Sequence, residues 1–187
     1  VQTEDRWFRP VDTETGPDGA VYLADWYDSR LTHVDPRDTW DHDRGRIYRM
    51  EAEGAKPVKP FDLAKLSSKD LIPYLSHQNK WYRQTALRLF WDRADKSVIP
   101  ALKKLVEERK DQTALDAFWA LNASGGFDNA MAAKTANHPN EFIRAWTVRL
   151  LGDAKKVSPA SQKQMTDLAR TESSVQVRSQ LACTSKR

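Results

Sequence analysis

Four stretches of the sequence repeat one helical pattern of apolar residues at a nearly constant spacing. Aligned without gaps, they place Ala86, Ala117, Thr147 and Leu181 at the same point, so that successive stretches lie 31, 30 and 34 residues apart. A shorter helical pattern precedes each of them. Two helices per period are typical of an α-solenoid, in which each helix pair buries its apolar face against its neighbours. We therefore predict a mainly-α fold, an α-solenoid of four helix pairs over residues 67–187.

Capping residues set the expected limits of these helices. Ser67 or Ser68, Ser97 and Ser158 are placed to cap first helices, and Gly125–Gly126 and Gly152 are placed to end helices. Together with the apolar spacing, they predict first helices at 67–76, 97–109, 126–137 and 158–170, and second helices at 79–94, 111–126, 140–154 and 174–185.

The first 50 residues show a different pattern, with short alternating runs separated by turn residues. The tripeptide Pro17–Gly19 is a turn signal, because proline presets φ and glycine accepts a positive φ. After it, Val21 and Leu23 alternate with other residues and predict a strand, with further strands before the turn and at 44–50. Three short antiparallel strands leave an unpaired edge that is prone to pair with another chain. We therefore expect this segment to need a partner surface.

Composition and charge change near residue 55. Residues 1–50 hold seven Arg, no Lys and eleven Asp or Glu, a net charge of −4, whereas residues 51–187 hold 23 basic and 15 acidic residues, a net charge of +8. The Lys, Pro and Gly content of the segment between them is typical of a linker. The positive charge of the helices is diluted and forms no dense Lys/Arg run, which argues against nucleic acid as a partner. We predict a β-segment at 1–50, a linker at 51–66 and a helical repeat domain at 67–187.

Several other features bound the class of protein. No apolar run approaches the roughly 18 residues of a spanning helix, so we expect no membrane span. The chain starts at Val1 without Met or a signal peptide, so we expect it to be part of a longer polypeptide, and its localisation is left open. Its single cysteine, Cys183, cannot form an internal disulfide, and we predict a small buried helix residue there.

The second helices resemble HEAT repeats, in which an Arg a few residues into the helix precedes a small packing residue. The stretches WYRQTALRLF, FIRAWTVRLLGD and VQVRSQLAC carry this pattern, with Arg83, Arg144 and Arg178 at the matching position. The second repeat departs from it with Ala114, and the period is shorter than the usual HEAT length. The resemblance implies that the three arginines are structural, each bonding backbone or acidic groups between adjacent repeats.

Residues 7–50, WFRPVDTETGPDGAVYLADWYDSRLTHVDPRDTWDHDRGRIYRM, resemble the last β-propeller blade of sorbosone and glucose dehydrogenase-like proteins. The resemblance is to the "membrane-bound dehydrogenase" group of planctomycete-type bacteria, in which HEAT-like helices follow the propeller. It implies that residues 1–50 are a partial blade and that the protein is extracytoplasmic or periplasmic. Pyrroloquinoline quinone (PQQ), haem and the catalytic base would then belong to missing parts of a parent protein, and no catalytic or cofactor-binding residue is assigned here.

An aspartate-rich loop precedes the third predicted strand. Asp41 and Asp43 form the D-x-D-x-G start of a calcium loop, and Asp38 lies close by, but the third acidic ligand and the distal Glu of an EF-hand are missing. Aspartate also favours turns and pairs with nearby arginines. We expect turn and ion-pair roles, with a calcium site at Asp38, Asp41 and Asp43 as the alternative and a catalytic carboxylate pair as a weaker one. His33 and Asp35 lie near Ser29, but sequence proximity is not triad geometry.

Arg88, Trp119 and Arg149 occupy the same repeat position on three second helices. If these helices line a concave surface, the three residues form a basic, aromatic stripe suited to an acidic protein segment, a glycan or nucleic acid. The alternative is a solvated polar face with one partly buried tryptophan. The other tryptophans of the predicted second helices are expected to fill the core. They are Trp81, Trp91 and Trp146.

These observations leave function hypotheses of different classes. We expect a non-catalytic scaffold or protein-interaction segment of a larger propeller–HEAT protein, with the upstream propeller or a neighbouring module as its partner. The alternative is the rim portion of a quinone-dependent sugar or alcohol dehydrogenase, which would not be catalytic by itself. A nucleic-acid-binding HEAT-like module is the weaker alternative.

Overall fold

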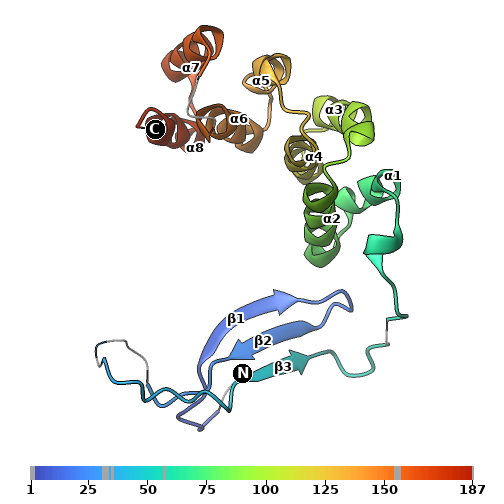
Figure 1. The fold of residues 1–187 in the computed structure, drawn as a ribbon, viewed down its shortest axis with the longest axis vertical. Helices are drawn as coiled ribbons and strands as arrows, with labels where there is room; N and C mark the ends of the chain where they lie inside the picture. The colour runs from blue at the N-terminus through green and yellow to red at the C-terminus, as the bar shows by residue number, and fades with distance from the viewer. Residues whose placement is uncertain (1–2, 31–33, 35, 57, 154–156, 187) are drawn as a thin grey trace. The chain divides into compact units, whose positions relative to one another are not determined.

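A computed structural model of the chain describes residues 3–30, 34, 36–56, 58–153 and 157–186. In this part of the chain, a three-stranded antiparallel sheet precedes eight α-helices, so the predicted mainly-α fold is confirmed (Figure 1). The strands are β1 (Pro10–Thr15), β2 (Val21–Asp25) and β3 (Arg46–Met50). The helices are α1 (Ser68–Leu71), α2 (Lys80–Arg93), α3 (Ile99–Glu108), α4 (Gln112–Ala123), α5 (Asn129–Thr135), α6 (Glu141–Asp153), α7 (Pro159–Thr171) and α8 (Val175–Thr184).

The chain divides into two compact units. The first comprises residues 1–61 with residues 78–82, and the second comprises residues 62–77 with residues 83–187. Three short 3-10 helices supplement the second unit, at Leu63–Lys65, Ile72–Ser76 and Lys96–Val98. The limits predicted for the domains and the linker stay predictions.

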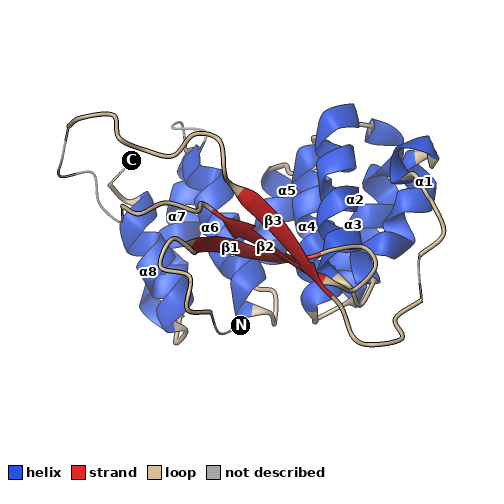
Figure 2. Cartoon of the chain, turned by 90° about the horizontal axis from the view of Figure 1, so that it is seen from below, coloured by secondary structure: helices blue, strands red, loops and turns tan. Residues whose placement is uncertain are grey.

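The sheet of the first unit has the strand order β1-β2-β3, and all its pairings are antiparallel (Figure 2). Gly19 in the turn between β1 and β2 has φ +80°, a value that glycine adopts without strain. In the centre of the sheet Leu23 lies opposite Thr13 on one side and Tyr48 on the other, and it is buried. Every residue of β1 is exposed, so the strand has no covered face among the described residues.

The helices of the second unit form four pairs in sequence order, as the repeat pattern predicts. The first helices of the last two pairs, α5 and α7, contact each other, and the second helices α4, α6 and α8 contact one another in series. Figure 1 shows α4, α6 and α8 in one row and α3, α5 and α7 in a second row. The core between the rows includes Phe90, Leu102, Phe118, Leu121 and Ile143, which are inaccessible to solvent. This arrangement is compatible with an α-solenoid.

Capping explains where most first helices begin. Ser158 accepts a hydrogen bond from the backbone N–H three residues later, as predicted, and of the two alternatives at the first helix it is Ser67 rather than Ser68 that does so. The expectation for Ser97 is wrong, because Asp95 takes that role and accepts from the Ser97 N–H at 2.9 Å. Gly152 does not lie beyond the end of its helix either, since α6 continues to Asp153.

Packing explains this last glycine. A Cβ on Gly152 would overlap the side chain of Thr184 in α8, so only glycine lets α6 and α8 approach this closely. Cys183 is exposed rather than buried as predicted, because it lies on the side of α8 opposite the buried Val177 and Thr184. Within the described ranges, no helix is both long and apolar enough to cross a bilayer.

Candidate functional sites

Hydrogen bonds and ion pairs within the aspartate-rich loop occupy two of its three candidate metal ligands. Asp41 accepts the backbone N–H groups of Asp43 and Arg44 at 3.0 and 3.1 Å, and it forms an ion pair with the Arg44 guanidinium at 2.5 Å. These contacts lower the pKa of Asp41, and the hydrogen bond from the Asp43 N–H contributes most to the shift. Asp38 lies 3.0 Å from Nε2 of His42, and this contact raises the pKa of the imidazole. Both carboxylates therefore already have partners.

Asp43 is exposed, and its side chain has no hydrogen bond or ion pair with any residue of the described ranges. Among the residues that the structure describes, no group of three or more His, Cys, Asp or Glu side chains is arranged to hold a metal ion. His33 and Asp35 lie outside the described residues. The calcium site therefore stays a prediction.

Two further aspartates anchor this loop from within. Asp28 is buried and accepts the backbone N–H of Arg30 at 2.8 Å and that of Asp41 at 2.7 Å. These two bonds lower the pKa of Asp28, because they stabilise its charged form. Asp25, also buried, accepts the N–H groups of Arg9 and Tyr27 at 2.7 and 3.0 Å. The carboxylates thus add to the two backbone hydrogen bonds, from Trp26 to Arg9 and from Asp28 to Trp7, that continue the pairing after β2 ends.

Arginines of the same unit stack on aromatic rings. Arg46 lies 3.7 Å from the ring centroid of Tyr27, and Arg44 lies 4.8 Å from that of Trp7. Tyr27 has φ +49°, a left-handed conformation that is uncommon outside glycine. The sequence suggested ion pairs for these arginines. Stacking was not foreseen, because Trp7 and Arg44 are distant in the sequence and no local signal joins them.

In the second unit, the structure connects two of the three residues of the predicted stripe. The rings of Trp119 in α4 and Trp146 in α6 meet edge to face with centroids 5.4 Å apart. The guanidinium of Arg149 lies 4.9 Å from the Trp146 centroid and 3.8 Å from the carboxylate of Asp153. We call Trp119, Trp146 and Arg149 the tryptophan–arginine stripe. Trp146 was expected in the core, but it is half-buried and links the other two.

Side chains of two helices, α6 and α8, line a pocket beside the stripe. A shallow pocket of about 170 Å³ lies beside Trp146 and Arg149, and Phe142 of α6 with Gln176 and Gln180 of α8 complete its lining. The indole Nε1 of Trp119 is buried and has no hydrogen-bond partner within the residues that the structure describes. Arg88 of α2 is exposed and makes no contact with the stripe in the described part of the chain. A signal for Trp146 was present, because it precedes Arg149 by three residues and shares its helix face.

The predicted structural arginines Arg83 and Arg144 make parallel contacts. Arg83 donates from Nη1 to the carbonyl of His77 at 2.7 Å, and Arg144 donates from Nη1 to the carbonyl of His138 at 2.8 Å. Both acceptors lie six residues before the arginine. The carbonyls belong to the connection that leads into the second helix, so each arginine closes its own helix pair.

Both arginines also pair with a carboxylate of the next helix pair. Arg144 donates from Nε and Nη2 to the two oxygens of Glu172 at 2.7 and 2.8 Å, and this bidentate contact lowers the pKa of Glu172. Nε of Arg83 lies 3.2 Å from the buried carboxylate of Asp116, whose pKa is raised because burial outweighs the arginine. In the described part of the chain, no carboxylate pairs with Arg178 in this way. The acidic partners were not identified from the sequence.

Comparisons with known proteins reach only the first of the two units. A family model described as a domain of unknown function (DUF7133) matches residues 1–54. No curated protein and no solved structure matches the chain.

Proposed function

We propose that this chain is a non-catalytic scaffold segment whose sheet docks on a partner protein. The observation that carries the proposal is the exposure of apolar side chains on the strands. Val11 of β1 is 63% exposed and Ile47 of β3 is 76% exposed, although both lie in a sheet. β-strands of soluble proteins ordinarily bury one face, so a sheet with this much exposed apolar surface is suited to a partner.

The strand order supports the same proposal. In the described residues β1 and β3 are the two edges of the sheet, and each presents unpaired backbone groups along its outer side. A propeller blade typically has four strands, so one further strand would complete this sheet. The partner that fits is therefore a protein that contributes a strand together with an apolar surface.

The resemblance of residues 7–50 to a last propeller blade identifies the partner class. On this proposal the partner is the upstream propeller of a sorbosone or glucose dehydrogenase-like protein, and α1–α8 are HEAT-like repeats that follow it. A quinone cofactor and the catalytic base would belong to that propeller, so this chain contributes part of the rim and no catalytic residue. The tryptophan–arginine stripe is a second surface, and its cation and ring edges suit an acidic protein segment.

A binding experiment tests the sheet proposal directly. The probe is a β-propeller of the sorbosone dehydrogenase-like group from which the last blade has been deleted, titrated with the full chain in a calorimeter. We expect binding that Ile47→Glu weakens at least about tenfold, since a charge would enter an apolar contact. Val175→Glu serves as the matched control, because Val175 is equally exposed but lies in α8. Absence of binding, or equal weakening by both variants, would refute the proposal.

A further inference from the structure

An arginine is the fourth residue of three second helices, Arg83 in α2, Arg144 in α6 and Arg178 in α8. The first two arginines each pair with a carboxylate of the helix pair that follows, at 3.2 Å for Arg83 and 2.7 Å for Arg144. The contact therefore joins one helix pair to the next rather than one helix to its own partner. At the position of Arg178, the same arrangement requires a carboxylate from a pair beyond α8.

Arg178 has the same place in its helix as Arg83 and Arg144, but among the described residues it makes neither their bond to a carbonyl six residues earlier nor their contact with a carboxylate. Its side chain is exposed, and the structure gives it no hydrogen bond, ion pair or ring contact among the described residues. Its backbone N–H bonds to the carbonyl of Ser174 within the first turn of α8, so its place in the helix is regular. Unlike Arg83 and Arg144, Arg178 has no helix pair after its own among the described residues.

The apolar face beside Arg178 is also incompletely covered. In α3, Leu102 and Val106 are inaccessible to solvent, whereas in α7 the described residues include a single buried one, Ser161. Met165 in the middle of α7 stays half-exposed. The difference accompanies the packing within each pair, because α3 packs closely along α4 whereas α7 makes few contacts with α8.

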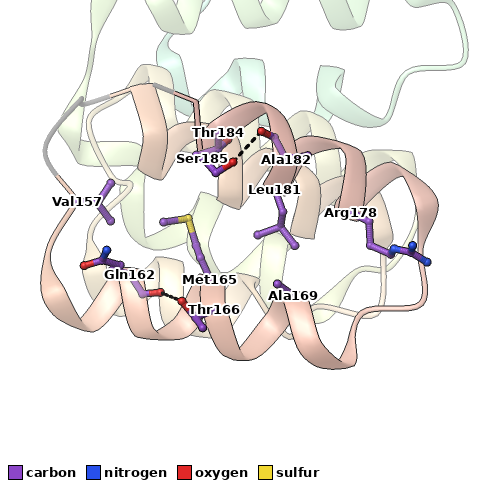
Figure 3. Close-up of a pocket in the computed structure, with 10 residues that line it drawn as sticks. All are labelled: Val157, Gln162, Met165, Thr166, Ala169, Arg178, Leu181, Ala182, Thr184 and Ser185. Carbon is purple, nitrogen blue, oxygen red and sulfur yellow. Dashed lines mark hydrogen bonds between the residues drawn. The ribbon is translucent and has the colours of Figure 1, made fainter.

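A groove runs between α7 and α8 at this end of the helical unit. It has a volume of about 720 Å³, and Figure 3 shows Met165 and Ala169 of α7 and Leu181 of α8 directed into it. Arg178 lies at one end of the groove, with its guanidinium directed away from the other labelled side chains. The residues aligned with Leu181 in the earlier repeats, Ala86, Ala117 and Thr147, are all fully buried. An apolar groove with a cation at its end thus remains open where earlier repeats are closed.

We propose that this groove is the docking surface for a further helix pair, whose apolar face covers Met165 and Leu181 and whose carboxylate pairs with Arg178. The occupant is defined by charge complementarity with Arg178 and by the contacts that Arg83 and Arg144 already make. This surface is separate from the sheet and the tryptophan–arginine stripe, so the inference goes beyond the proposed function.

The chain itself supplies a suitable probe. Glu172 belongs to the α7–α8 pair and already meets an arginine of the preceding pair, and α6 and α8 begin 34 residues apart, at Glu141 and Val175. A second copy of residues 154–187 fused after residue 187 keeps this spacing and offers its own copy of Glu172 to Arg178. We expect the fusion to add helical circular dichroism and to raise the melting temperature.

Variants of the fusion separate the proposed contact from a general effect of length. Arg178→Met should lower the melting temperature of the fused chain by about 3 °C and should change that of the original chain much less. Replacing the Glu172 copy with Gln should cause the same loss, with no further loss in the double variant. Arg170→Gln is the matched control, because Arg170 is an exposed cation of α7 outside the groove.

Three results would overturn the proposal. One is a fusion that gains no helical signal, because the groove then accepts no helix pair. Another is an equal effect of Arg178→Met in both chains. The third is a dimer of the original chain in sedimentation that Met165→Glu dissociates, because a second copy would then occupy the groove.

Discussion

Replacing Arg144 with Met removes a charge but keeps most of the side-chain volume. The side chain of Arg144 is 17% exposed and that of Glu172 is 3% exposed, so the two form a largely buried ion pair. Without the guanidinium, Glu172 keeps the backbone N–H of Ser174 as a donor at 2.8 Å but loses both donors of the bidentate contact. The carbonyl of His138 loses a donor as well.

The expected cost follows from these lost contacts. Breaking a buried pair by removing one partner costs about 3–5 kcal/mol, because the remaining charge is buried without compensation. The partial exposure of Arg144 allows some water to reach the site, so we expect the free energy of unfolding to fall by about 3 kcal/mol. This value is the upper end of the roughly 1–3 kcal/mol that the loss of a buried hydrogen-bond partner typically costs. The exposed pair of Lys163 and Asp167 provides the comparison, and Lys163→Met should cost at most about 0.5 kcal/mol.

The effect should depend on pH in a defined direction. Arg144 lowers the pKa of Glu172 below its ordinary value of 4.5, so the carboxylate contributes stability above pH 4.5 and loses it as the pH falls through the folded-state pKa. Wild type and Arg144→Met should therefore differ most near neutral pH and converge in acid.

Urea unfolding at pH 7 and at successively lower pH, followed by circular dichroism, measures these free energies. A double-mutant cycle with Glu172→Gln then isolates the coupling between the two side chains, which we expect to be at least about 1 kcal/mol. A cost equal to that of Lys163→Met, or a difference between wild type and variant that does not change with pH, would refute the reasoning.

Three other outcomes are expected. Gly152→Ala should lower the free energy of unfolding by about 1–3 kcal/mol in the same urea assay, since its Cβ would overlap Thr184, and an unchanged value would contradict the close packing of α6 and α8. Millimolar calcium should leave the melting temperature unchanged, because Asp38 and Asp41 already pair with His42 and Arg44, and an upward shift would instead support the calcium site. The chain with added quinone cofactor and calcium should reduce no dye with aldoses or alcohols, and cofactor-dependent turnover would contradict the scaffold proposal.

The sequence predicts those parts of the fold that depend on near neighbours along the chain. Helical spacing predicts all four second helices to within a few residues. It also predicts the cap at Ser158 and narrows the first cap to Ser67 or Ser68, because the bonded groups lie three residues apart. Asp95 displaced Ser97 as a cap because both residues can accept a backbone N–H, and spacing alone does not choose between them.

Contacts between repeats were harder to predict. The resemblance to HEAT repeats singled out Arg144, but its partner Glu172 lies 28 residues away at the end of another helix, where no periodic signal marks it. The half-buried position of Trp146 has a similar cause. A large aromatic residue satisfies the pattern of a core position whether or not a neighbouring helix covers it, so its exposure depends on packing that spacing does not encode.

The two arginine–carboxylate contacts between helix pairs also restrict how such pairs can be shuffled by duplication or recombination. Arg83 finds its acid at Asp116, within the following second helix, whereas Arg144 finds Glu172 three residues before the following second helix begins. If the α7–α8 pair were transplanted to follow α2, the repeat alignment would place Gln180 at the position of Asp116, and Arg83 would lose its carboxylate. The pairs that follow α2 and α6 are therefore not directly interchangeable, because Arg83 and Arg144 meet their carboxylates at different positions of the following pair.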